Sequence, residues 1–324
     1  MNISKIKQII SRFHKAKVLV IGDLILDEFI WGKVDRISPE APVPVVRVES
    51  ESFMPGGASN VANNIAALGA KVYLSGITGN DKNADILRGE LKKKGIDLGG
   101  VIIDGERPTT LKTRIIAHHQ QVVRVDRESA MPIEDNLCDQ ILTFIRQKID
   151  SIDALIIEDY GKGLITARLL SEIIPLARKH KKIITVDPKI DHFSYYKGIT
   201  SITPNTQEAE GISGIKIKVD ADIDRVGKKI INELGSESVL LTLGENGMRL
   251  FTKDGRITHI STVAQEVFDV SGAGDTVIAT FTLSLSCGAK MQEAAYISNY
   301  AAGIVVGKVG VAVVTKEELF DKIK

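Results

Sequence analysis

One short segment, residues 269–276 (DVSGAGDT), combines small residues with two carboxylates just before a long apolar stretch that predicts a helix. Gly272, Ala273 and Gly274 leave the backbone bare at the start of that helix, where free N–H groups and the helix dipole favour an anion such as phosphate. Asp275 would repel that anion, so its position makes sense if it accepts the proton of a hydroxyl that attacks a bound phosphoryl group. The alternative is a simple helix cap, because Ser, Gly and Asp are common at helix starts.

The composition predicts a globular protein with a large core. The chain has 324 residues, of which 44% are hydrophobic and 26% are charged, and this favours one α/β domain spanning residues 1–324. Its formal net charge of +1 argues against nucleic acid as the main partner, since that role needs a concentrated basic surface. No apolar run of about 18 residues is present, so no membrane span is expected. The first residues lack a signal-peptide core, and Cys138 and Cys287 occur in apolar helical contexts, which together favour the cytoplasm.

Alternating helical and strand patterns predict the layers of the fold. Residues 17–22 (KVLVIG) predict a first buried strand, and beyond Asn136 predicted helices and strands alternate as far as a strand-like run that ends near Phe268. Repeated units of this kind form a mostly parallel sheet covered by helices on both faces, so we expect a three-layer αβα fold. Asp23 and Asp27 follow the first strand, at the sheet edge where such folds bind ligands. They would contact sugar hydroxyls or cap a loop.

Polar residues recur where the later strands are predicted to end, and this pattern is what a cleft for nucleotide and metal requires. They are Glu158, Asp159, Asp187, Lys189, Asn205, Glu208, Thr242 and Gly244.

Two extended segments, at about 29–52 and 101–127, predict a small β-sheet that forms a lid or an oligomer contact. Lys112 and Arg114 on the second segment could meet a substrate phosphate, whereas the alternative is a solvated sheet face. After the first segment, Gly56 and Gly57 precede a predicted helix and permit a ligand to approach the backbone. Asn60 is a poor helix former within that helix, and it would bond either to a polyhydroxyl ligand or to a buried carbonyl.

Three of these elements, in this order along nearly the whole chain, resemble the ribokinase-like (PfkB) carbohydrate kinases. They are the Gly56-Gly57 turn with Asn60, the Asn205-x-x-Glu208 element and DVSGAGDT. Further blocks resemble the heptose 7-phosphate kinases within that family, which occur alone or fused to an adenylyltransferase, and many of these blocks lie in the substrate half and the lid. They are GDLILDEFIWG, ISPEAPVPVV, TLKTRIIAHHQQVVRVDRE, EDYGKG, VDPK and GKVGVAVV.

The resemblance implies a role for each matching position. Asp275 would be the catalytic base, and the turn of Gly272, Ala273 and Gly274 the anion hole for the transferred phosphoryl group. Asn205 and Glu208 would organise Mg²⁺ through water. Sugar-binding positions would be Asp27, Gly56, Gly57 and Asn60, and ATP-binding positions Lys189, Asn205, Thr242, Gly244 and Asn299. A monovalent cation near Asp269 and Ser271, and a homodimer formed through the lid, would follow the habit of the family.

The expected reaction is ATP-dependent phosphorylation of the anomeric O1 of D-glycero-β-D-manno-heptose 7-phosphate, a step toward ADP-heptose for lipopolysaccharide or S-layer glycans. A kinase for another sugar or sugar phosphate is the main alternative, because the fold and the DVSGAGDT turn are shared among many acceptors. A non-catalytic sugar or nucleotide sensor is a second alternative. A nicotinamide-dependent dehydrogenase is disfavoured, since no G-x-G-x-x-G follows the first strand.

Overall fold

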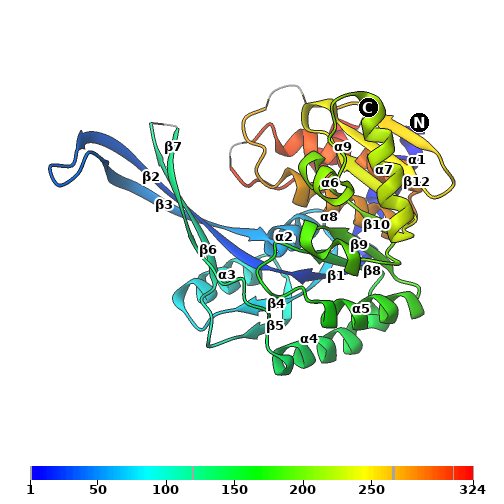
Figure 1. Ribbon diagram of the computed structural model, residues 1–324, viewed down its shortest axis with the longest axis horizontal. Coiled ribbons are helices and arrows are strands. Elements are labelled where there is room, and N and C mark those ends of the chain that lie inside the picture. The colour runs from blue at the N-terminus through cyan, green and yellow to red at the C-terminus, as the bar shows by residue number, and fades with distance from the viewer. Residues whose placement is uncertain (1, 119, 265–266, 309, 324) are drawn as a thin grey trace.

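The computed structural model describes residues 2–118, 120–264, 267–308 and 310–323. A nine-stranded sheet lies between two layers of helices, and a four-stranded sheet projects from the body on one side (Figure 1). The prediction of a three-layer α/β fold with a small second sheet is therefore confirmed. No helix of the described residues is long and apolar enough to cross a lipid bilayer.

The nine-stranded sheet is parallel except at one edge, where β12 and β13 pair antiparallel. This agrees with the predicted mostly parallel sheet. Its strands in spatial order are β13 (Ile257–Ile260), β12 (Met248–Thr252), β11 (Ser238–Thr242), β10 (Ser201–Ile202), β9 (Ile183–Asp187), β8 (Ala154–Glu158), β1 (Lys17–Gly22), β4 (Lys71–Thr78) and β5 (Asp97–Ile103).

Both faces of this sheet are buried, because alternate residues of a strand point to opposite sides. In β1, Leu19 and Ile21 pack into one core with α4 (Asp135–Lys148), α5 (Ala167–Lys179), α6 (Thr206–Ser213) and α7 (Asp220–Leu234). Val18 and Val20 pack into a second core on the other face. The helices of that second core are α1 (Ile3–Ser11), α2 (Ala58–Ala67), α3 (Lys82–Lys93), α8 (Ala273–Ser286), α9 (Met291–Val305) and α10 (Lys316–Lys322).

Short 3-10 helices link several of these elements. They are η1 (Phe13–Lys15), η2 (Ile149–Ser151), η3 (Ile190–Tyr195) and η4 (Gly244–Asn246).

The four-stranded sheet, here called the lid, is built from the two segments that the sequence predicted to pair. Its order is β3 (Pro44–Gly57), β2 (Leu24–Ile37), β6 (Thr110–Ala117) and β7 (Gln120–Arg127). The predicted lid boundary at residue 101 is wrong, because residues 101–103 belong to β5 and pair with β4 in the large sheet. Apolar runs look alike in both sheets, so sequence alone did not separate them.

The strand-like run predicted to end near Phe268 is also not a strand. The preceding strand β13 ends at Ile260, and the described residues between Ser261 and Phe268 form no sheet pairing. Val267 and Phe268 are exposed, so their apolar character does not mark a buried strand here. The turn before α8 is instead attached to the body by backbone hydrogen bonds, such as that from Phe268 N–H to Val306 O at 2.8 Å.

Candidate active site

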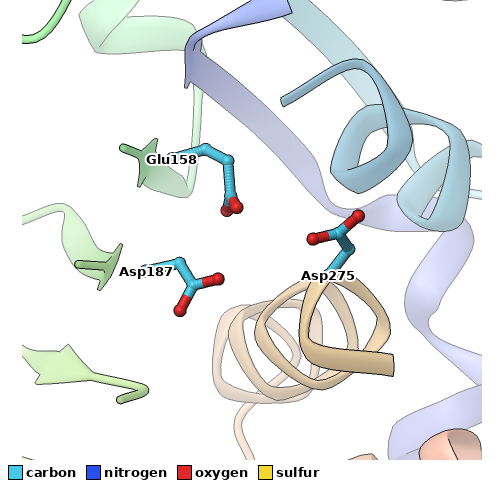
Figure 2. A group of neighbouring side chains, drawn as sticks. All are labelled: Glu158, Asp187 and Asp275. Atoms are coloured by element: carbon cyan, nitrogen blue, oxygen red, sulfur yellow. The ribbon is translucent and has the colours of Figure 1, made fainter. Parts of the chain in front are cut away.

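Three carboxylates converge at the centre of the molecule, between the sheet and α8 (Figure 2). Glu158 ends β8 and Asp187 ends β9, and the two residues are direct partners in the parallel register of these strands. Asp275 comes from the first turn of α8. One carboxylate oxygen of each residue lies within 4.8 Å of the others, so neighbouring strand ends and a helix start together form an acidic cluster.

The acidic cluster is electrostatically unfavourable by itself. Both carboxylate oxygens of Glu158 are buried and have no hydrogen-bond partner among the described residues. Burial, followed by the charges of Asp187 and Asp275, raises the pKa of Glu158 well above its usual value. Burial also raises the pKa of Asp187 well above the usual range, with the charge of Glu208 as the next cause. A bound cation would relieve this repulsion, and carboxylate oxygens are the ligands that Mg²⁺ prefers.

Asp275 is held by hydrogen bonds to both of its oxygens. The Asn60 amide donates to Oδ2 at 2.6 Å, and the Tyr160 hydroxyl donates to Oδ1 at 3.2 Å. Burial raises the pKa of Asp275 to about 6, while these two hydrogen bonds oppose the rise and the charge of Asp27 adds to it. At neutral pH the carboxylate is therefore mostly ionised but close enough to its pKa to accept a proton.

The start of α8 offers backbone donors beside Asp275. Its N-cap, Gly272, has a φ of 75°, a conformation that glycine adopts without strain. Ala273 N–H donates to Val270 O at 3.2 Å, so this predicted member of the anion hole is already bonded. Among the described residues no acceptor faces the N–H groups of Gly272 and Gly274. These two groups and the helix dipole are available to an anion.

The glycine turn predicted for sugar binding directly precedes α2, and Asn60 of that helix contacts Asp275 of the acidic cluster. Gly56 and Gly57 end β3, and a Cβ atom at Gly56 would lie 2.3 Å from Asp27 Oδ2. Glycine at position 56 therefore makes room for the buried Asp27 carboxylate. Asn64 donates to the Asn60 carbonyl at 2.9 Å and fixes this part of α2. The sequence predicted that the Asn60 side chain bonds to a polyhydroxyl ligand or to a buried carbonyl. In the structure its amide instead donates to the Asp275 carboxylate.

The two cations predicted to meet a phosphate occur on β6, and both already contact acids. Arg114 donates to Asp27 Oδ1 at 2.5 Å. Lys112 donates to Asp126 at 3.1 Å and to Glu128 at 3.2 Å. Their side chains are mostly buried, with 13% exposure for Lys112 and 18% for Arg114. They are therefore placed beside the predicted sugar residue Asp27, and they are not part of a solvated sheet face.

Asp23 was also predicted to bind sugar, but its carboxylate contacts backbone. Oδ2 accepts the N–H groups of Tyr160 at 2.9 Å and Lys162 at 3.0 Å, and Oδ1 accepts that of Leu164 at 3.3 Å. The side chain is buried, and burial raises its pKa to about 6 against the effect of these bonds. The loop-capping alternative accounts for all of these contacts.

The Asn205-x-x-Glu208 element starts α6 as a capping box. Asn205 N–H donates to Glu208 Oε2 at 2.8 Å, and Glu208 N–H donates to Asn205 Oδ1 at 3.0 Å. Burial raises the pKa of Glu208, opposed by the bonds to Asn205 and the charge of Lys189. Because Glu208 in turn raises the pKa of Asp187, it belongs to the electrostatic surroundings of the acidic cluster.

Of the remaining predicted ATP positions, Lys189 follows β9, Thr242 and Gly244 lie at the end of β11, and Asn299 lies on α9. Lys189 N–H donates to the Tyr196 hydroxyl at 3.2 Å, and Thr242 forms a parallel bridge with Asn205. Gly244 begins η4 with a φ of 59°, and the buried Asn299 amide donates to Ser261 O at 2.9 Å. A groove of about 560 Å³ lies beside them, and its lining includes Thr206, Leu243, Glu245, Asn246, Ser261 and Thr262.

Comparisons with known proteins show the family of this chain. The family model described as "pfkB family carbohydrate kinase" matches residues 15–318. The chain belongs to the pfkB family of carbohydrate kinases. It is accordingly an enzyme that phosphorylates a carbohydrate, as the sequence predicted.

Individual relatives and solved structures support the same assignment. The kinase is similar to the bifunctional protein HldE of Desulfatibacillum aliphaticivorans, with 46% identity over 310 residues, covering 96% of this chain and 63% of that protein. It is 44% identical over 319 residues to the bifunctional protein HldE of Geobacter metallireducens, covering 98% of this chain and 65% of that protein. The chain thus spans just under two thirds of the length of these relatives.

The fold resembles that of Arabidopsis thaliana ribokinase complexed with ribose and ATP, with a TM-score of 0.77 and 18% identity, covering 95% of this chain and 99% of that one. It also resembles the ribokinase of Thermotoga maritima, with a TM-score of 0.74 and 21% identity, covering 95% and 99% of the two chains. These structures support the ribokinase-like fold that the sequence predicted.

Three residues of the kinase site were missing from the set of site residues predicted by sequence. Glu158 and Asp187 were predicted only as members of a polar rim of the kind that a nucleotide and metal cleft requires, without individual roles, and Tyr160 was not singled out within EDYGKG. The register of β8 with β9 brings Glu158 beside Asp187, and this register cannot be read from either strand alone. A signal was present, since an acid ends each of these two buried strands.

The pKa of Asp275 predicts a pH dependence. A base with a pKa of about 6 is protonated and inactive below that pH, so kcat/KM should fall as the pH drops through about 6. If the base were an aspartate with an ordinary pKa, kcat/KM would fall at about pH 4 instead. Initial rates across this pH range, at saturating nucleotide, check the prediction, and an acid limb near the ordinary value would contradict it.

Proposed function

We propose that this kinase transfers the γ-phosphoryl group of ATP to the anomeric O1 of D-glycero-β-D-manno-heptose 7-phosphate, giving the 1,7-bisphosphate. The observation that carries the proposal is the buried pairing of Asp275 with Asn60 beside the free donors of α8, because it unites a base, an acceptor pocket and an anion site. The heptose-kinase sequence blocks and the HldE relatives favour this acceptor over others in the family. The product would serve ADP-heptose synthesis.

In the proposed reaction, the O1 hydroxyl attacks the γ-phosphorus in line while Asp275 takes its proton. A bond forms between O1 and the γ-phosphorus, the bond to the bridging oxygen of ADP breaks, and ADP leaves. The N–H groups of Gly272 and Gly274 would stabilise charge on the transferred group. Asn60 and Tyr160 keep the Asp275 carboxylate oriented toward the acceptor.

The donor set of the acidic cluster fits Mg²⁺, since Glu158 has unpartnered carboxylate oxygens directed at Asp187 and Asp275. Glu158 and Asp187 would hold the ion, with Glu208 and Asn205 acting through water. Mg²⁺ would neutralise phosphate charge when bound. Asp269, which accepts Ser271 N–H at 2.8 Å, is the candidate position for a monovalent cation; the fold neighbour phosphofructokinase-2 of Escherichia coli has been solved in complex with potassium.

The proposal includes a homodimer that forms through the lid. All residues of β7 are exposed, and exposed apolar side chains gather on the lid. The exposed apolar side chains of the lid are Ile37, Val43, Val48, Val122, Val123 and Val125. Such residues on a projecting sheet favour contact with another chain.

An ADP-release assay with candidate acceptors tests the proposed function. Heptose 7-phosphate should give the highest kcat/KM among heptose 7-phosphate, fructose 6-phosphate, ribose and a nucleoside. Asp275→Asn should retain substrate binding but lower kcat by about 10²–10⁴-fold, because it cannot accept the proton. Unchanged turnover by a folded Asp275→Asn variant, or a clear preference for another acceptor, would contradict the proposal.

Binding of the phosphate group of the acceptor should depend on the lid cations Lys112 and Arg114. Replacing Lys112 or Arg114 with Met should raise the KM for heptose 7-phosphate by about 10-fold or more, since a charged hydrogen bond contributes about 1.5–3 kcal/mol. Lys33→Met is the matched control, because Lys33 pairs with Glu49 on an exposed part of the lid. If Lys112 and Arg114 can both be removed without raising this KM, the phosphate contact is wrong.

A further inference from the structure

Tyr160 is the second hydrogen-bond donor to the proposed base, and within the described part of the chain its hydroxyl makes no other hydrogen bond. It donates to Asp275 Oδ1, while Asn60 donates to Oδ2. The Tyr160 hydroxyl is the donor in this contact, because an ionised carboxylate only accepts hydrogen bonds. With one donor on each oxygen, the carboxylate is fixed against rotation.

The position of Tyr160 is set by Asp23. The loop after β8 curls around the Asp23 carboxylate, which accepts three of its backbone N–H groups, from Tyr160, Lys162 and Leu164. Gly161 has a φ of 68° and Gly163 a φ of 88°, so the curl relies on conformations that glycine adopts readily. The loop therefore has its shape because an acceptor lies at its centre.

The backbone of Asp23 anchors the other donor as well. Ala58 N–H, at the start of α2, donates to Asp23 O at 3.1 Å. Asn60 follows Ala58 by two residues in the same helix. Asp23 N–H in turn donates to Glu158 O at 3.2 Å. One residue thus connects the helix that carries Asn60, the loop that carries Tyr160 and the strand that carries Glu158.

These contacts leave the Asp23 carboxylate poorly suited to bind a sugar. It is 4% exposed, and both of its oxygens are used by backbone donors. Asp27 differs, since its one recorded partner among the described residues is Arg114 on Oδ1, and its Oδ2 faces Gly56 of the glycine turn. The two acids after β1 therefore differ in their surroundings, since Asp27 faces Arg114 and the glycine turn and Asp23 faces the loop.

We propose that Asp23 is a positioning residue that acts on Asp275 through Tyr160, and that Tyr160 orients the base for the acceptor hydroxyl. This inference rests on the proposed phosphoryl transfer by Asp275. It predicts that loss of either residue lowers kcat and leaves acceptor binding intact, because neither side chain contacts the sugar.

Tyr160→Phe and Asp23→Asn test the inference by separating kcat from KM. Tyr160→Phe keeps the ring and removes the donor, and should lower kcat by about 10-fold, the value of one hydrogen bond to a charged group. Asp23→Asn should lower kcat at least as much, with acceptor KM within about twofold of the wild-type value in both variants. Asp27→Asn is the contrast and should raise acceptor KM. Tyr73→Phe, on the far end of β4, controls for loss of a tyrosine hydroxyl and should match wild type.

The double variant Asp23→Asn/Tyr160→Phe gives a further test. If Asp23 acts through Tyr160, the double variant should lose little more activity than Asp23→Asn alone, whereas independent effects would multiply. Thermal unfolding of each variant verifies that the protein is folded. If Asp23→Asn does not fold, Tyr160→Phe alone decides, and wild-type kcat in that variant overturns the inference.

Other outcomes also contradict the inference. A raised acceptor KM with unchanged kcat in Asp23→Asn would show that Asp23 binds the sugar. If wild type prefers another acceptor, the proposed substrate fails, but the same kcat and KM comparison is made with that acceptor. If wild type phosphorylates none, the proposed function fails, and a crystal structure of Tyr160→Phe shows whether the Asp275 carboxylate reorients. An unmoved carboxylate would overturn the positioning role.

Discussion

The repulsion among three neighbouring carboxylates, of which Glu158 and Asp275 are buried and Asp187 is half-buried, is the constraint on which this structure depends. Glu158, Asp187 and Asp275 lie within 4.8 Å of one another, and burial raises the pKa of each. A cluster chosen for stability alone would pair these groups with cations or donors, yet both Glu158 oxygens have no partner among the described residues. The cost is explained if a cation and a phosphoryl group bind there.

The fold produces this convergence from distant parts of the sequence. Parallel pairing of β8 with β9 aligns Glu158 with Asp187, and α8 then packs over the sheet and directs its first turn at both. The opposite face of the sheet is covered by α4, α5, α6 and α7, and the hydrophobic core between them supports the same strands. Asn60 and Asp275 are 215 positions apart, and their hydrogen bond joins α2 to α8 at the point where acceptor and phosphate would meet.

Sequence predicted the parts of the site that have a local signature. DVSGAGDT predicted a helix start with a base, and the apolar periods predicted the layers, because a buried strand or helix face needs those patterns. The Asn205 and Glu208 pair was predicted because it matches a motif of the family. The structure shows that the two residues also form the capping box at the start of α6. The sequence offered loop capping as one of two roles for Asp23, but it could not identify the loop or the contact of Tyr160, because both depend on residues after β8 wrapping around a carboxylate that lies between β1 and β2. The lid boundary was missed for a similar reason, since β5 and β6 differ in partners rather than in composition.

The free energy of unfolding of Glu158→Gln, with and without Mg²⁺, tests the central claim most directly. Because the folded-state pKa of Glu158 is raised, its favourable contribution exists at low pH and is lost as the pH rises through that pKa. Without metal, the free energy of unfolding of the variant should therefore exceed that of wild type increasingly as the pH rises above the ordinary glutamate pKa, and should depend less on pH. Mg²⁺ at about 100 times its Kd should stabilise wild type by about 2.7 kcal/mol, and should stabilise the variant less at the same concentration. Equal stability and equal stabilisation by Mg²⁺ in both proteins would contradict the account.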